Sequence, residues 1–173
     1  MTARATAAAR ARAIRLLILD VDGVLTDGRL IYGPTGEDTK VFYVRDGHAI
    51  VSARAAGLDI AVVSGRDSAA VTRRLVELGV REIHQGVPDK VALLPALCAR
   101  HAVAPAQVAF MGDDLPDMPL LRRVGLALAP ANAVREVRRV ADWISRVPGG
   151  SGAVREAIEW LLRCRGAWPP ATA

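Results

Sequence analysis

Two aspartates, Asp20 and Asp22, stand at the end of the apolar run Leu16–Leu19. Residues two apart at a strand end share a face, so both carboxylates would point the same way. A third carboxylate, Asp113, follows a second apolar run, Val108–Met111. A cluster of carboxylates is costly unless a cation neutralises it. Oxygen ligands of this kind favour Mg²⁺, which is typically bound by one or two carboxylates together with a substrate phosphate.

A hydroxyl and an ammonium group complete the chemistry. Ser64 follows the apolar run Ile60–Val63 and could donate a hydrogen bond, and Lys90 would place a positive charge against phosphate oxygens. With Mg²⁺ and a carboxylate nucleophile, these groups suit phosphoryl transfer through an aspartyl phosphate. In this interpretation Asp20 attacks phosphorus. Asp22 protonates the leaving alkoxide and then takes a proton from the water that hydrolyses the acyl phosphate.

A sheet has to position these residues. Apolar runs alternate along the chain with segments of helical period, which predicts an α/β fold with a Rossmann-like, doubly wound, mostly parallel sheet. In such sheets ligands bind outside the carboxyl ends of the strands, where the polar residues fall here. We expect one domain over residues 15–165, a small hairpin at about 29–44, a disordered arm over residues 1–14 and a C-terminal tail over residues 166–173.

Charge and composition exclude other classes of protein. The net charge is +5, but residues 1–15 hold four arginines and no acid, so the rest of the chain is nearly neutral. With only 4% aromatic residues, nucleic-acid binding is not expected. No apolar stretch reaches the roughly 20 residues of a membrane helix, so no membrane partner is expected. Cys98 and Cys164 lack metal-ligand spacing, which favours a reduced cytoplasmic chain. Lys40 is assigned no function, because arginine-rich codon usage explains the scarcity of lysine.

The constellation resembles the haloacid dehalogenase superfamily of phosphatases. The first motif of that superfamily stands here as Asp20-Val21-Asp22-Gly23-Val24-Leu25-Thr26, and Ser64, Lys90 and the pair Asp113-Asp114 follow in the expected order. The resemblance implies that Asp20 is the nucleophile and Asp22 the acid and base, with Ser64 and Lys90 also catalytic. It implies that Mg²⁺ is bound by Asp20, the backbone carbonyl of Asp22 and Asp113, with Asp114 beside these ligands.

The likeness narrows to the 3-deoxy-D-manno-octulosonate 8-phosphate phosphatase family. The segments that carry it are LLILDVDGVLTDG, VRDG at 44–47, VVSGR at 62–66, MGDDLPD at 111–117 and GGSGAVRE at 149–156. This family has no cap domain, and the gaps between motifs are too short to hold one. The resemblance implies hydrolysis of the octulosonate phosphate to the free sugar acid and phosphate, in lipopolysaccharide precursor synthesis. It also implies a cytoplasmic homotetramer, and substrate contacts from Arg45, Asp46, Gly47, Gly65, Arg66 and Arg74.

Departures from the family pattern at Tyr43, His48 and Val51 keep other substrates and roles open. One alternative is a phosphatase of nonulosonate 9-phosphates, of the KDN or sialic acid type. Another is a catalytically weak relative that acts as an interaction subunit. The glycine-rich stretch 149–152 is either a loop before the last helix or a flexible segment that reaches a neighbour.

Overall fold

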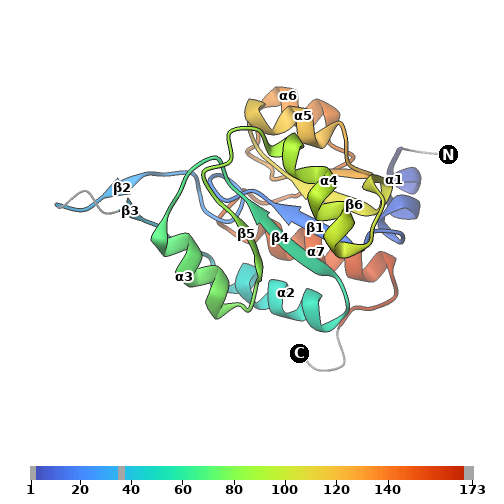
Figure 1. The fold of residues 1–173 in the computed structure, drawn as a ribbon. Coiled ribbons are helices and arrows are strands. Elements are labelled where there is room, and N and C mark those ends of the chain that lie inside the picture. Colours follow the sequence, from blue (N-terminus) through green and yellow to red (C-terminus); the bar gives the residue numbers. More distant parts are fainter. Residues whose placement is uncertain (1–2, 35–37, 170–173) are drawn as a thin grey trace.

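The computed structural model describes residues 3–34 and 38–169. Its centre is a six-stranded sheet in the order β5-β4-β1-β6-β7-β8, in which every neighbouring pair is parallel (Figure 1). This confirms the predicted doubly wound sheet. The strands are β1 (Leu16–Leu19), β4 (Asp59–Val63), β5 (Glu82–His84), β6 (Val108–Met111), β7 (Leu126–Ala129) and β8 (Trp143–Ile144).

Helices cover both faces of the sheet (Figure 1). The strands are nearly continuous apolar runs because both of their faces are buried. In β1, Leu17 and Leu19 pack into one core, whereas Leu16 and Ile18 pack into the other. Residues of α1 (Ala3–Ala11), α2 (Val44–Ala55), α3 (Ala69–Glu77) and α7 (Ala153–Cys164) share the first core. Residues of α4 (Lys90–His101), α5 (Met118–Leu121) and α6 (Arg135–Val140) share the second, and two 3₁₀ turns lie at Pro105–Gln107 and Leu115–Asp117.

The predicted hairpin is present and projects from the body of the molecule (Figure 1). It pairs β2 (Ile31–Tyr32) with β3 (Asp38–Thr39) in an antiparallel ladder. The ladder is shorter than the predicted range of about 29–44, and Val44 belongs to α2. Residues 35–37 at its tip lie outside the described part of the chain. No helix within the described ranges is long and apolar enough to cross a membrane.

Segments near both ends of the described chain pack on the core. Within the expected disordered arm over residues 1–14, residues 3–11 form helix α1, which packs against α7. Ala7 and Ala11, one helical turn apart, are buried there, and Arg10 pairs with Asp142 at 2.5 Å. These contacts hold residues 3–11 against the folded domain, so this part of the expected arm is ordered. At the other end Trp168 packs on the core, where the Arg155 guanidinium lies over its ring.

Candidate active site

The carboxyl ends of β1, β4 and β6 lie side by side and open onto a cleft of about 400 Å³. Eight of the predicted site residues line it: Asp20, Asp22, Ser64, Gly65, Arg66, Lys90, Asp113 and Asp114. They come from four separate stretches of sequence, and adjacent parallel strands bring them together as the sequence analysis expected. Asp117 lines the same cleft.

Three carboxylates in the cleft form a compact cluster. Asp20, Asp113 and Asp117 each offer an oxygen within 4.8 Å of the others. Burial, together with the charge of Asp117, raises the pKa of Asp20 to about 6, although Lys90 lowers it. Burial and the neighbouring carboxylates Asp20, Asp117 and Asp114 raise the pKa of Asp113 to about 7. The cluster is therefore short of positive charge, and a hard divalent cation fits this set of oxygen donors.

Lys90, the first residue of α4, supplies part of that positive charge. Its Nζ lies 2.7 Å from Oδ1 of Asp20 and 2.6 Å from Oδ1 of Asp117, and its side chain is buried. Burial alone would lower the pKa of Lys90, but the two carboxylates raise it overall. The ammonium group thus stays charged beside the expected nucleophile.

Asp117 is the functional candidate that the sequence analysis missed. It is only 2% exposed, and its Oδ2 accepts a hydrogen bond from the backbone amide of Asp113 at 2.9 Å. The 3₁₀ turn Leu115–Asp117 folds it back into the cleft, four residues after Asp113. By contrast Asp114 is exposed, and its side chain caps this turn through the amide of Leu115. The signal in the sequence was the spacing of Asp113 and Asp117, about one helical turn.

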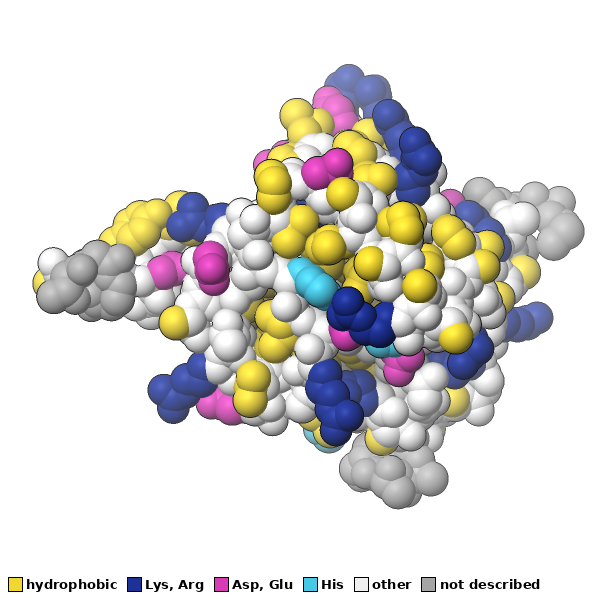
Figure 2. All heavy atoms as spheres, in the orientation of Figure 1, with side chains coloured by type: hydrophobic (Ala, Val, Ile, Leu, Met, Phe, Trp, Pro, Cys, Tyr) yellow, Lys and Arg dark blue, Asp and Glu magenta, His cyan; other side chains and the backbone are white. Residues whose placement is uncertain are grey.

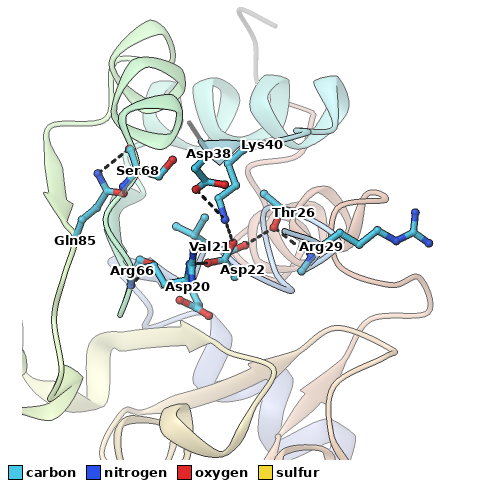
Figure 3. Close-up of polar contacts among 12 residues, drawn as sticks. Asp20, Val21, Asp22, Thr26, Arg29, Asp38, Lys40, Arg66, Ser68 and Gln85 are labelled. Carbon is cyan, nitrogen blue, oxygen red and sulfur yellow. Dashed lines mark hydrogen bonds and ion pairs between the residues drawn. The ribbon is translucent and has the colours of Figure 1, made fainter. Parts of the chain in front are cut away.

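Asp22, the expected acid and base, has a partner that the sequence analysis set aside. Lys40 lies 2.5 Å from Oδ1 of Asp22, and the Lys40 side chain is only 1% exposed (Figure 3). The sequence analysis therefore overlooked a buried ion pair, since a lysine side chain is rarely buried to this extent unless it is paired. On the other side, Nε of Arg66 lies 3.6 Å from Oδ2 of Asp22.

Comparison with known proteins agrees with this geometry. Residues 77–158 match the family model of haloacid dehalogenase-like hydrolases. The chain is 43% identical over 158 residues to 3-deoxy-D-manno-octulosonate 8-phosphate phosphatase KdsC of Escherichia coli K12, and the match covers 91% of this chain and 84% of that one. The chain belongs to the octulosonate 8-phosphate phosphatase family. It is a phosphoric monoester hydrolase of the haloacid dehalogenase type.

Solved structures of octulosonate 8-phosphate phosphatases share the fold. The Yersinia pestis enzyme superposes with a TM-score of 0.91 at 39% identity, covering 93% of this chain and 87% of that chain. The Moraxella catarrhalis enzyme, solved in complex with a magnesium ion, a phosphate ion and KDO, gives a TM-score of 0.90 at 38% identity. That match covers 93% of this chain and 92% of the Moraxella chain.

Four residues that the family resemblance assigned to substrate lie outside the cleft: Arg45, Asp46, Gly47 and Arg74. Asp46 is buried in α2, and its Oδ1 accepts a hydrogen bond from the backbone amide of Arg155 at 2.7 Å. It therefore caps the first turn of α7, a contact that spacing along the sequence does not reveal. The Arg45 guanidinium lies over the Tyr43 ring, and Arg74 pairs with Glu77 at 3.4 Å.

The family segment that begins at Gly149 packs against residues 20–26, the loop after β1, called the catalytic loop because it carries Asp20 and Asp22. The amide of Gly150 donates to the carbonyl of Val24 at 3.0 Å. A Cβ atom on Gly149 would lie 1.8 Å from the carbonyl oxygen of Gly23, so only glycine permits this approach. Gly23 in turn lies against Asp113, since a Cβ there would fall 2.1 Å from the Asp113 carboxylate. In this structure residues 149–152 form a loop that supports the site.

Proposed function

We propose that this chain hydrolyses 3-deoxy-D-manno-octulosonate 8-phosphate to KDO and phosphate, with Mg²⁺ as its cofactor. The observation that carries the proposal is that Asp20 and Asp22 open onto one cleft with Lys90 and the carboxylate cluster. The substrate is supported by curated relatives at 41–43% identity that carry this activity in their names. The ion follows from the oxygen donors of the cluster and from the magnesium in the Moraxella relative.

Asp20, the backbone carbonyl of Asp22 and Asp113 would hold Mg²⁺, which when bound supplies positive charge to the transferring phosphoryl group. The Asp20 carboxylate attacks phosphorus, and the bond to the sugar oxygen breaks. Asp22 gives its proton to that oxygen, so the sugar acid leaves as the alcohol. Asp22 then takes a proton from water, which attacks the aspartyl phosphate, releases phosphate and restores Asp20.

Ser64 and Lys90 hold the phosphate while this happens. The hydroxyl oxygen of Ser64 accepts a hydrogen bond from the backbone amide of Arg66 at 3.2 Å. The hydroxyl proton is therefore free to be donated to a phosphate oxygen. Lys90 keeps its charge between Asp20 and Asp117 and faces the same cleft. Both residues thus offset charge on the transferring group.

Arg66 is the proposed partner of the sugar-acid carboxylate, since a guanidinium binds a carboxylate through two parallel hydrogen bonds. Its side chain is 45% exposed at the mouth of the cleft, and Gly65 beside it leaves the backbone open to an anion. For Arg45 and Arg74 a substrate role would require the cleft of a neighbouring subunit, because they lie outside this one. Asp46 and Gly47 are buried in α2, so we propose no direct substrate contact for them.

A homotetramer assembled through the hairpin accounts for its exposed apolar surface. Leu30, Ile31, Tyr32 and Val41 are each between 45% and 62% exposed, and Figure 2 shows apolar side chains gathered on the projecting hairpin. A cleft without a cap is open to water, and a neighbouring subunit would close it. We also propose a cytoplasmic location, the ordinary compartment for free thiols such as Cys98 and Cys164.

The test is phosphate release with Mg²⁺ from a panel of phosphate esters: the octulosonate 8-phosphate, a nonulosonate 9-phosphate and ordinary sugar phosphates. We expect selective turnover of the octulosonate ester, lost in Asp20→Asn and with EDTA. Preference for the nine-carbon acid would keep the mechanism and overturn the substrate. Absence of release from every ester, with Mg²⁺ still bound, would overturn the enzyme assignment in favour of an interaction subunit. Sedimentation of the wild type and of Tyr32→Asp tests the tetramer.

A further inference from the structure

Lys40 is a buried charge at the base of the hairpin, directly after β3. Its Nζ lies 2.5 Å from Oδ1 of Asp22 and 3.5 Å from Oδ2 of Asp38. In Figure 3 Lys40 and Asp38 reach from the same segment toward the Asp22 carboxylate. Neither oxygen of Asp38 has a hydrogen-bond partner within the described chain, and the ion pair that Asp38 forms there is the one with Lys40. Ordering a long side chain in this way costs conformational entropy, which the contact with Asp22 has to offset.

We propose that Lys40 is a positioning residue for Asp22: it fixes the orientation of the carboxyl group that gives a proton to the leaving oxygen and then takes one from water. The inference rests on the proposed mechanism, in which Asp22 is the acid and base. Because Lys40 belongs to the hairpin, the placement of the hairpin then controls proton transfer in the cleft.

The backbone around Asp22 does not depend on Lys40. The amide of Asp20 donates to the carbonyl of Met111 at 3.0 Å, and the amide of Thr26 donates to the carbonyl of Val21 at 3.0 Å. These bonds anchor the loop after β1 on the sheet. Lys40 contacts the side chain of Asp22, so its loss would free the carboxylate to rotate while the loop stays in place.

Arg66 cannot replace Lys40. Within the described chain these are the two cations that pair with Asp22, and Arg66 is the more distant, at 3.6 Å. Its side chain is 45% exposed, whereas that of Lys40 is 1% exposed. In the proposed function Arg66 also binds the substrate carboxylate. Lys40 is then the cation that remains with Asp22 when substrate is bound.

Leaving-group dependence separates positioning from a general structural role. A sugar alkoxide is a poor leaving group and needs the proton of Asp22, whereas p-nitrophenolate leaves with little help. In Lys40→Met we expect kcat/KM for the sugar phosphate to fall about 100-fold, within the range that general acid catalysis contributes, and kcat/KM for p-nitrophenyl phosphate to fall only about threefold. The quantity compared between variants is the ratio of kcat/KM for the sugar phosphate to kcat/KM for p-nitrophenyl phosphate.

Three further variants make the test decisive. Thr39→Ala, at the neighbouring exposed position of β3, should leave the ratio unchanged. Lys40→Gln keeps a hydrogen-bond donor near Asp22, so its kcat/KM for the sugar phosphate should lie between those of Lys40→Met and the wild type. It also replaces Lys40→Met in the comparison if that variant does not fold. In an Asp22→Asn background, Lys40→Met should no longer change the ratio.

Equal losses on both esters, or a ratio change that persists without Asp22, would overturn the inference. If the wild type hydrolyses other alkyl phosphates and not the octulosonate ester, the proposed substrate fails. The Lys40 comparison then proceeds with the accepted alkyl ester, so the two failures are distinguishable.

Discussion

The carboxylate of Asp46 in α2 caps the amino end of α7 through the backbone amide of Arg155, at 2.7 Å. Burial raises the pKa of Asp46 to about 6, although the amides of Arg155 and Gly152 and the charge of Arg155 lower it. Its Oδ2 is buried and has no hydrogen-bond partner among the residues that the structure describes. The residue that the family motif suggested for substrate binding therefore joins two helices of the core.

This pKa predicts a pH-dependent effect of Asp46→Asn. The folded state binds the proton more tightly than the unfolded state, so the stabilisation is complete below about pH 4 and is lost as the pH rises through about 6. The shift corresponds to about 3 kcal/mol. The wild type should therefore lose up to about 3 kcal/mol of unfolding free energy between pH 4 and pH 7.5 through this group, whereas asparagine does not titrate. The unfolding free energy of Asp46→Asn minus that of the wild type should rise by about the same amount over this range.

Urea unfolding at the two pH values measures this difference. Asp67→Asn, on the exposed loop before α3, is the control, and its effect should be the same at both. A constant difference between Asp46→Asn and the wild type would contradict the prediction.

Asp117→Asn should impair catalysis more than Asp114→Asn. Asp117 holds Lys90 at 2.6 Å and accepts the amide of Asp113, so its loss disturbs both the phosphate-binding ammonium and a metal ligand. We expect kcat to fall at least about 100-fold in Asp117→Asn, as for removal of a group that aligns charge in the transition state. Asp114 is exposed and caps a turn, so Asp114→Asn should stay within a few-fold of the wild type. The measurement is the steady-state kcat of both variants on the same ester. A larger loss of kcat in Asp114→Asn than in Asp117→Asn would contradict this prediction.

Binding of Mg²⁺ should stabilise the folded protein through the carboxylate cluster. A ligand that binds only the folded state adds about 2.7 kcal/mol at 100 times its Kd. The thermal midpoint of the wild type should therefore rise with Mg²⁺ and return with EDTA. In Asp113→Asn the rise should be largely lost, because one of the three clustered carboxylates is gone. Equal Mg²⁺ responses in the two proteins would place the ion elsewhere.

The fold was predictable because its strands are short apolar runs with buried faces, and the cleft because parallel strands end at one edge. What escaped prediction depends on contacts between distant segments. Helix α1 forms where Ala7 and Ala11 meet α7, and Asp46 caps a helix more than a hundred residues further along the chain. The ion pairs of Lys40 with Asp22 and of Asp117 with Lys90 form only when the hairpin and the 3₁₀ turn fold these residues toward the cleft.

Gly149→Ala should damage the active site, whereas Gly125→Ala should damage only stability. The two glycines form a matched pair. An added Cβ would lie 1.8 Å from the Gly23 carbonyl oxygen in one case and 2.0 Å from the Ala106 carbonyl oxygen in the other. Neither glycine has a positive φ, so alanine suits both backbones apart from these contacts. Gly125 directly precedes β7 and so lies at the amino ends of the parallel strands, whereas the cleft lies at their carboxyl ends.

In Gly149→Ala the catalytic loop has to move away from the added methyl group, and Gly23 carries that shift to Asp113. We expect the Mg²⁺ concentration for half-maximal activity to rise about tenfold or more and kcat to fall, as expected when groups that must align are displaced by about 1 Å. In Gly125→Ala the thermal midpoint should fall while both kinetic values, expressed per folded enzyme, stay near those of the wild type. Circular dichroism fixes the folded fraction for each variant. If the two variants lost activity in equal proportion to their folded fraction, the loop at residues 149–152 would contribute stability alone, and its contact with Gly23 would have no part in positioning Asp113.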